Sequence, residues 1–130
     1  MVDENVQKIT TLSLKKLLKE IKTGSITCQD AINAFTLKAI EATEITNCVT
    51  EFLYDQAIVQ ARSLDELPID QRGPLHGLPF SVKEHFFIKD KEFTAGLYTL
   101  IGQKANYNAQ IGTLALFGIE FSKFIKNIAI

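Results

Sequence analysis

The sequence has no surplus of charge of either sign. Its 14 Lys and Arg residues stand against 15 Asp and Glu, the formal net charge is −1, and the basic residues form neither a stripe nor a polybasic cluster. Clusters of that kind are the usual footprint of nucleic-acid binding or of an anionic membrane surface. We therefore expect no nucleic-acid partner, while membrane association stays open.

Long hydrophobic runs are also missing. The longest charge-free stretch, Ala105 to Ile119, includes Asn106, Asn108 and Gln110, and it is shorter than the ~20 apolar residues of a membrane span. The N-terminus, MVDENVQKIT, is polar and acidic and has no apolar secretory region behind it. We expect an intracellular protein, either cytoplasmic or peripheral to a membrane.

Cysteine and histidine are scarce and show no metal-site spacing. Cys28 and Cys48 lie within predicted elements without a CxxC pattern, and His76 and His85 are the only histidines. Neither histidine stands at ligand spacing from a cysteine or a carboxylate. We expect no metal and no cofactor, cysteines that pack as small buried residues in a reducing compartment, and structural or surface roles for the histidines.

The chain does contain two helical patterns near its start. Its 130 residues, 46% of them hydrophobic, suit one globular domain or part of a larger one. Apolar residues recur at helical spacing after Ser13, a predicted N-cap, and Gly24 supplies a left-handed stop. Thr27 and Asp30 then form a box-like N-cap for a second helix. Residues 1–45 are predicted to form a helical hairpin.

Residues 46–130 alternate strand and helix patterns, which favours an α/β architecture. The apolar run Leu78–Val82 stands between turn signals, as in a strand buried on both faces of a sheet. The other predicted elements are a strand at Cys48–Leu53, a helix capped by Asp55, a turn at Glu66–Pro74, a helix in AQIGTLALFG (109–118) and a strand in EFSKFIKNIAI (120–130).

Lys83, at the end of that apolar run, is the candidate functional residue. Lysine is seldom buried without a specific reason. A dry environment favours its neutral form, and a neutral amine on a rigid strand end can act as a general base. The alternative is a surface lysine paired with Glu84 or with an acid across the sheet. Ser81, two residues away, is expected on the same face of the strand.

The segment GPLHGLPFSVKE (73–84), followed by FTAGL (93–97), resembles the amidase signature family. In that family a G-x-L-x-G-[VIL]-P-[IVF]-S-[VL]-K segment carries the catalytic lysine. The upstream TNCVTEFL strand and the Lys-Glu pair, where Lys-Asp is commoner, are most similar to the fatty-acid amide hydrolase branch. The resemblance runs from about Leu12 to Leu116. It implies the N-terminal part of an amidase-signature α/β fold, a helical hairpin followed by strands of a mixed sheet covered by helices.

The resemblance implies a Ser–cis-Ser–Lys triad that hydrolyses amide bonds, with Lys83 as its lysine. The substrate would be a small-molecule amide, with a lipid amide or ester favoured, and the full-length protein could form a homo-oligomer. The five serines, Ser13, Ser25, Ser63, Ser81 and Ser122, do not lie in the Gly-Gly-Ser-Ser-Gly-Gly type of loop that carries the other two triad members. In the family that loop lies beyond the point where this sequence ends.

The sequence also departs from the family pattern in smaller ways. Asp90 stands where the family usually has Gly after Lys, and Asn108 replaces the usual Asp before the helix. Two interpretations follow. The chain is the N-terminal fragment of a serine amidase and inactive alone, or it is a non-catalytic, truncated amidase-like protein with a binding role or none. An amidotransferase subunit acting on charged tRNA is a weaker third interpretation, which the low net charge does not favour.

Overall fold

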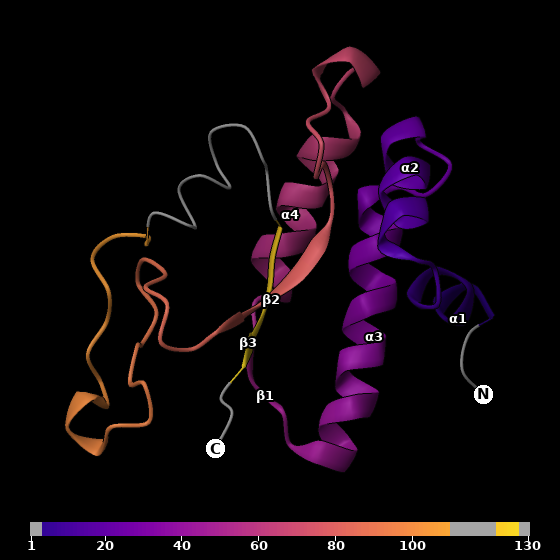
Figure 1. Ribbon diagram of the computed structural model, residues 1–130. Helices are drawn as coiled ribbons and strands as arrows, with labels where there is room; N and C mark the ends of the chain where they lie inside the picture. Colours follow the sequence, from indigo (N-terminus) through magenta and orange to yellow (C-terminus); the bar gives the residue numbers. More distant parts are fainter. Residues whose placement is uncertain (1–3, 110–121, 128–130) are drawn as a thin grey trace.

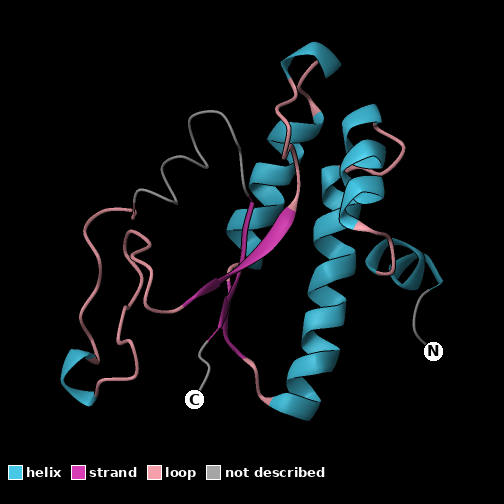
Figure 2. Cartoon of the chain, in the orientation of Figure 1, coloured by secondary structure: helices cyan, strands magenta, loops and turns pink. Residues whose placement is uncertain are grey.

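The computed structural model describes residues 4–109 and 122–127 of the chain. Helices lie along one side of a small sheet, and a long irregular segment extends beyond the sheet on the other side (Figures 1 and 2). The described helices are α1 (Glu4–Thr10), α2 (Leu14–Thr23), α3 (Cys28–Thr46) and α4 (Tyr54–Asp65), with 3₁₀ turns at Ile69–Gln71 and Tyr98–Leu100; the strands are β1 (Val49–Phe52), β2 (Pro79–Lys83) and β3 (Ser122–Asn127).

The predicted helical hairpin is confirmed as α2 and α3. Ser13 occupies the N-cap position of α2, and Gly24 ends that helix at a left-handed φ of 81°. The hydroxyl of Thr27 accepts the backbone N–H of Asp30 at 2.9 Å, and the Asp30 carboxylate accepts the N–H of Thr27 at 3.3 Å. This reciprocal pair satisfies two N–H groups that the first turn of α3 would otherwise leave without partners.

A short helix, α1, precedes the hairpin and was not predicted. It packs against α3 and buries Val6 and Ile9, three residues apart. Two apolar residues in a seven-residue segment give too short a pattern to separate a helix from a loop. The helix is therefore stabilised by tertiary packing and not by a strong local signal.

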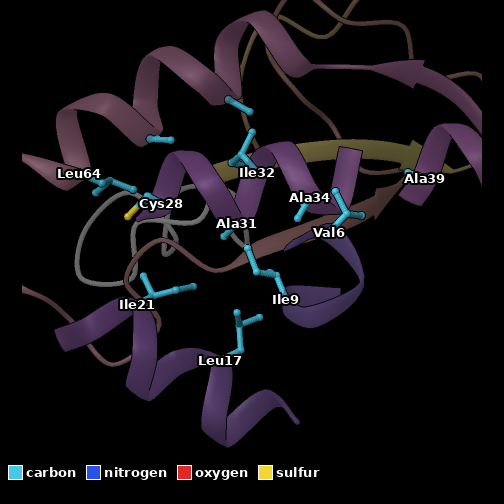
Figure 3. Packing of buried hydrophobic residues seen from close by; sticks show 12 residues of the cluster. Val6, Ile9, Leu17, Ile21, Cys28, Ala31, Ile32, Ala34, Ala39 and Leu64 are labelled. Atoms are coloured by element: carbon cyan, nitrogen blue, oxygen red, sulfur yellow. The ribbon is translucent and has the colours of Figure 1, made fainter. Parts of the chain in front are cut away.

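The core lies between the helices of this layer. Figure 3 shows side chains from α1 and α2 pointing toward α3, with Leu64 of α4 on the opposite side of α3. Ile21 and Ile32 are fully buried, and each such side chain contributes roughly 1.5–3 kcal/mol through removal from water. The buried cluster consists of Val6, Ile9, Leu17, Ile21, Cys28, Ala31, Ile32, Ala34, Ala39, Ala57, Ala61 and Leu64.

The sheet has the strand order β1-β3-β2. β3 pairs antiparallel with β1 and parallel with β2, so the sheet is mixed, as predicted. α4 packs against β3, and α3 contacts β2. Within the described sheet, β1 and β2 are the edge strands. The predicted C-terminal strand is confirmed as β3, whereas residues 110–118 of the predicted helix before it lie outside the described residues.

The prediction that the strand around Leu78–Val82 is buried on both faces is wrong for the described chain. Pro79, Phe80 and Val82 are half-buried, while Ser81 and Lys83 are exposed. The physical reason is that only one face of this three-stranded sheet is covered by the described helices (Figure 2). The apolar run correctly predicted a strand, β2. The run alone does not show whether one face or both faces of that strand are covered by other elements.

The N-cap predicted for the third sequence helix is also wrong. Leu53 occupies the N-cap position of α4, and Asp55 lies inside the first turn. A carboxylate in the first turn still interacts favourably with the positive end of the helix dipole. The acidic signal therefore located the helix start to within two residues. The division into residues 1–45 and 46–130 stays a prediction.

Candidate functional site

Lys83 is the last residue of β2 and is exposed. Its backbone lies in register with Asn127 of β3, and its carbonyl accepts the N–H of Phe86 at 3.1 Å, which turns the chain away from the sheet. Ser81 is exposed as well, as expected for two residues on one face of a strand. The strand therefore presents a serine and a lysine side chain on its exposed face.

An ion pair of Lys83 with the neighbouring glutamate was the alternative prediction. In residues 4–109 the ion pairs are Lys38–Glu41 and Lys91–Glu51, and Lys83 belongs to neither. The surface position that the alternative required is found, but its carboxylate partner is not found in this part of the chain. Coverage of Lys83 by other parts of a longer protein stays a prediction.

Glu84 follows Lys83 directly and points away from solvent. It is only 5% exposed. One carboxylate oxygen accepts the backbone N–H of Thr94 at 2.5 Å, and the other accepts the N–H of Ala95 at 2.8 Å. Sequence reasoning missed this contact, because nothing in the spacing of Glu84 and the FTAG turn shows that the two segments meet.

A cavity of about 400 Å³ lies beside this contact and holds charges of both signs. Its lining includes Glu84 and Thr94, and also Lys91, which forms an ion pair with Glu51. Lys83 is not among the lining residues, so the cavity does not bring other polar groups to that lysine. The full lining is Thr50, Glu51, Glu84, Asp90, Lys91, Glu92, Thr94 and Lys104.

A second polar cluster, formed by Cys28, Asp65 and His76, connects the start of α3 to the end of α4. The Cys28 sulfur lies 3.6 Å from Nε2 of His76, and both residues are buried. The Asp65 carboxylate accepts the backbone N–H groups of Cys28 at 2.6 Å and Gln29 at 3.2 Å. Arg72 donates to the carbonyls of Ile21 and Lys22, both at 3.1 Å, at the end of α2.

The electrostatics of this cluster suit a structural role. Burial, followed by a hydrogen bond with Asp65, raises the pKa of the Cys28 thiol to about 12, so the thiol stays protonated and is a poor nucleophile. Burial and the nearby Arg72 charge lower the pKa of His76. Burial opposes ionisation of Asp65, but hydrogen bonds from Cys28 and Gln29 outweigh it and lower the Asp65 pKa.

No group of three or more histidine, cysteine or acidic side chains suited to a metal ion occurs among the described residues.

Cys48 is half-exposed, whereas the prediction was a buried cysteine. His85 is exposed and its ring lies 4.3 Å from that of Phe86. The two histidines therefore occupy one buried and one surface position.

The fold of this chain, helices packed against a mixed sheet, recurs in solved amidase structures. A solved fatty acid amide hydrolase superposes with a TM-score of 0.87 at 28% identity, covering 98% of this chain and 23% of that chain. An amidase family protein from Bacillus anthracis shares the fold with a TM-score of 0.80 at 23% identity, over 95% of this chain and 26% of that chain.

The amidase family model matches residues 30–114, and the chain belongs to this family. It is 43% identical over 91 residues to fatty acid amide hydrolase 1 of Caenorhabditis elegans, covering 68% of this chain and 16% of that protein. It is 37% identical over 99 residues to an acetamidase of Emericella nidulans, covering 74% and 18% respectively. The predicted family and its likeness to fatty acid amide hydrolases are confirmed. The chain spans only 16% to 18% of the length of these two curated relatives.

Proposed function

We propose that this chain is the N-terminal part of a longer serine amidase and that Lys83 is the base of its catalytic triad. The observation that carries the proposal is the position of Lys83, the last residue of an edge strand, in a segment that the amidase family model covers. This chain spans less than a fifth of the length of these relatives. That share supports the proposal that most of the catalytic domain belongs to a part of the protein outside this sequence.

In the proposed reaction neutral Lys83 removes a proton from a bridging serine, which in turn removes the proton of the nucleophilic serine. The serine oxygen attacks the amide carbonyl, the C–N bond breaks, and the amine leaves with the proton passed back through the bridge. Water then hydrolyses the acyl-enzyme. Backbone N–H groups would stabilise the developing oxyanion. Both serines and these N–H groups would come from the part of the protein that this chain does not include.

A lysine works as a base only when it is neutral, and a dry environment disfavours the charged form. Lys83 is exposed in the described chain. The proposal therefore requires that the remainder of the domain cover the open face of β2 and bring the bridging serine to the Lys83 nitrogen. Ser81, exposed on the same face, would then lie next to that interface.

The proposed substrate is a small-molecule amide, and within that class an amide of a fatty acid. Relatives named for fatty acid amides and for acetamide both match this chain, so the broad class has more support than the choice within it. We propose no metal or organic cofactor, since the triad supplies both nucleophile and base. No helix within residues 4–109 combines the length and apolarity needed to cross a membrane; an intracellular location and a homo-oligomeric state stay predictions.

The reading frame of the transcript beyond Ile130 distinguishes the serine amidase proposal from the alternative of a truncated, non-catalytic protein. If the reading frame continues past Ile130 into a Gly/Ser-rich segment, the alternative loses its support. If it ends near Ile130, the chain cannot supply a triad and the catalytic proposal is wrong for this gene product.

The role of Lys83 is tested in a chimera in which residues 4–109 replace the superposed segment of the solved fatty acid amide hydrolase. We expect hydrolysis of a fatty acid amide, and a loss of at least about 100-fold in kcat for Lys83→Ala, since general bases contribute about 10²–10⁴. Lys89→Ala, at another exposed lysine, is the matched control and should retain activity. A Lys83→Ala chimera with parental kcat, or a folded chimera without hydrolysis, would contradict the proposal.

A further inference from the structure

The carboxylate of Glu84 is buried at the point where the chain leaves β2. Acidic side chains are almost never fully buried unless they are paired or hydrogen-bonded. Glu84 is 5% exposed, and its two oxygens accept two consecutive backbone N–H groups, one each from Thr94 and Ala95. The side chain therefore joins the strand end to a turn ten residues further along the chain.

The turn that receives Glu84 has an unusual backbone. Ala95 and Gly96 both have positive φ, 49° and 80°, a conformation that is costly for alanine. The N–H of Gly96 donates to the Thr94 hydroxyl at 3.3 Å, and the N–H of Leu97 donates to the Thr94 carbonyl at 2.8 Å. Successive N–H groups in such a turn converge on one point and form an anion-binding concavity. Here the anion is the Glu84 carboxylate of the same chain.

Glu84 and Lys83 lie on opposite sides of the strand end, because one is buried and the other exposed. A carboxylate held at both oxygens resists rotation of the strand end about its own axis. Such a rotation would swing the Lys83 side chain off its direction. The Lys83 carbonyl, which accepts the N–H of Phe86 at 3.1 Å, is fixed in the same turn.

The geometry points to Glu84 as a positioning residue for the catalytic lysine. Through its two hydrogen bonds to the 94–96 turn, it sets the direction in which Lys83 leaves β2. This inference rests on the proposed function, since without catalysis by Lys83 its direction has no consequence for activity. A loss of placement by about 1 Å in a catalytic group can cost 100-fold in rate, so a side chain that never touches the substrate can still control turnover.

Glu84→Gln is the decisive substitution. The amide keeps the size of the side chain and one acceptor oxygen, but it turns an NH₂ group toward the second backbone N–H, where two donors oppose each other. Glu84→Asp keeps both acceptor oxygens and the charge on a stem one methylene shorter. Glu92→Gln is the matched control, because the Glu92 carboxylate lines the same cavity and accepts the N–H of Gly102 at 3.3 Å.

The three variants are measured in the chimera described above, with Lys83→Ala beside them. We expect kcat to fall at least tenfold for Glu84→Gln with KM within twofold of the parent, an intermediate kcat for Glu84→Asp, and parental values for Glu92→Gln. The rate at which a fluorophosphonate labels the nucleophilic serine should fall in the same order, because that reaction depends on serine activation and little on amide binding.

The inference is overturned if Glu84→Gln and Glu92→Gln have equal kcat while Lys83→Ala is inactive, which leaves the proposed function intact. It is also overturned if Glu84→Gln raises KM and leaves kcat unchanged. An active Lys83→Ala protein instead contradicts the proposed function itself. Should Glu84→Gln unfold at the assay temperature, Glu84→Asp decides: parental kcat and labelling rate in that variant would overturn the inference.

Discussion

Gly77 is the position where a single methyl group should destabilise the chain most clearly. Its backbone has a φ of +66°, and a Cβ added there would lie 2.3 Å from the Cys28 sulfur and 2.9 Å from Cγ2 of Ile21. Cys28 and Ile21 are 1% and 0% exposed, so neither can move into solvent. The residue must therefore be glycine both for its backbone conformation and for the space around it.

The expected cost of Gly77→Ala has two parts. Holding alanine at a left-handed φ costs about 1–2 kcal/mol. Forcing a methyl group into a filled core costs roughly a further 1–3 kcal/mol, since neighbouring side chains must leave their rotamers. Together these give a loss of about 2–5 kcal/mol in the free energy of unfolding. The measurement is urea unfolding of the chain followed by far-ultraviolet circular dichroism, which reports mainly on the helices.

Gly102→Ala separates the two contributions. Gly102 has a similar φ of +83°, but an added Cβ would meet no heavy atom within 4 Å. We expect this control to lose only the conformational part, about 1–2 kcal/mol. In addition, Gly77→Ala should show a coupling of at least about 1 kcal/mol with Cys28→Ala, because the second change removes the clashing sulfur. Equal destabilisation by the two glycine variants would refute the packing explanation.

Three further predictions concern backbone strain, thiol reactivity and acid stability. Asp90→Gly should raise the free energy of unfolding by about 0.5–1 kcal/mol in urea unfolding, because Asp90 has a φ of +65° that glycine adopts without a Cβ clash. Iodoacetamide at neutral pH should label Cys48 at least tenfold faster than Cys28, measured by mass spectrometry of peptides. The reason is that hydrogen bonds from Thr46 and Thr43 lower the pKa of Cys48, while burial raises the pKa of Cys28 to about 12. Equal labelling rates in the folded chain would contradict this prediction. The pKa of His76 in the folded chain lies below its ordinary 6.5, so neutral His76 contributes its full share to the free energy of unfolding above pH 6.5 and loses that share as the pH falls further. The urea midpoint should therefore drop between pH 7 and pH 5. The drop should be smaller in His76→Asn, which has no imidazole to protonate.

Local signals explain why the hairpin could be predicted from the sequence. Thr27 and Asp30 cap α3 through contacts three residues apart, and Gly24 ends α2 through its own backbone conformation. Both capping interactions involve residues within about one helical turn of the helix end. A local stretch of sequence is therefore enough to predict where these helices start and stop. The departure noted at Asp90 is of the same kind, because a left-handed backbone there satisfies a local requirement that glycine more often meets.

Long-range contacts explain what could not be predicted. The burial of β2 depends on which elements cover the sheet, and a run of apolar residues reports only that the strand is apolar. Glu84 meets the 94–96 turn, and Arg72 meets the carbonyl ends of α2, only because the intervening segments fold back. Lys83 was predicted as the catalytic residue from its motif, and that role stays a proposal. The side chains around Lys83 come from distant parts of the chain, which a local pattern does not describe.

The strand order β1-β3-β2 has a consequence for biosynthesis. β3, the last of the three described strands in chain order, lies between β1 and β2. The pairing of β1 and β2 with β3 therefore cannot form until residues 122–127 have left the ribosome. At roughly 5–20 residues per second, the stretch of about 40 residues after Lys83 takes several seconds to translate. During that interval the helices can already pack together, while the backbone N–H and C=O groups of β2 have no partner strand. Chaperones or strands of other chains could bind to these groups.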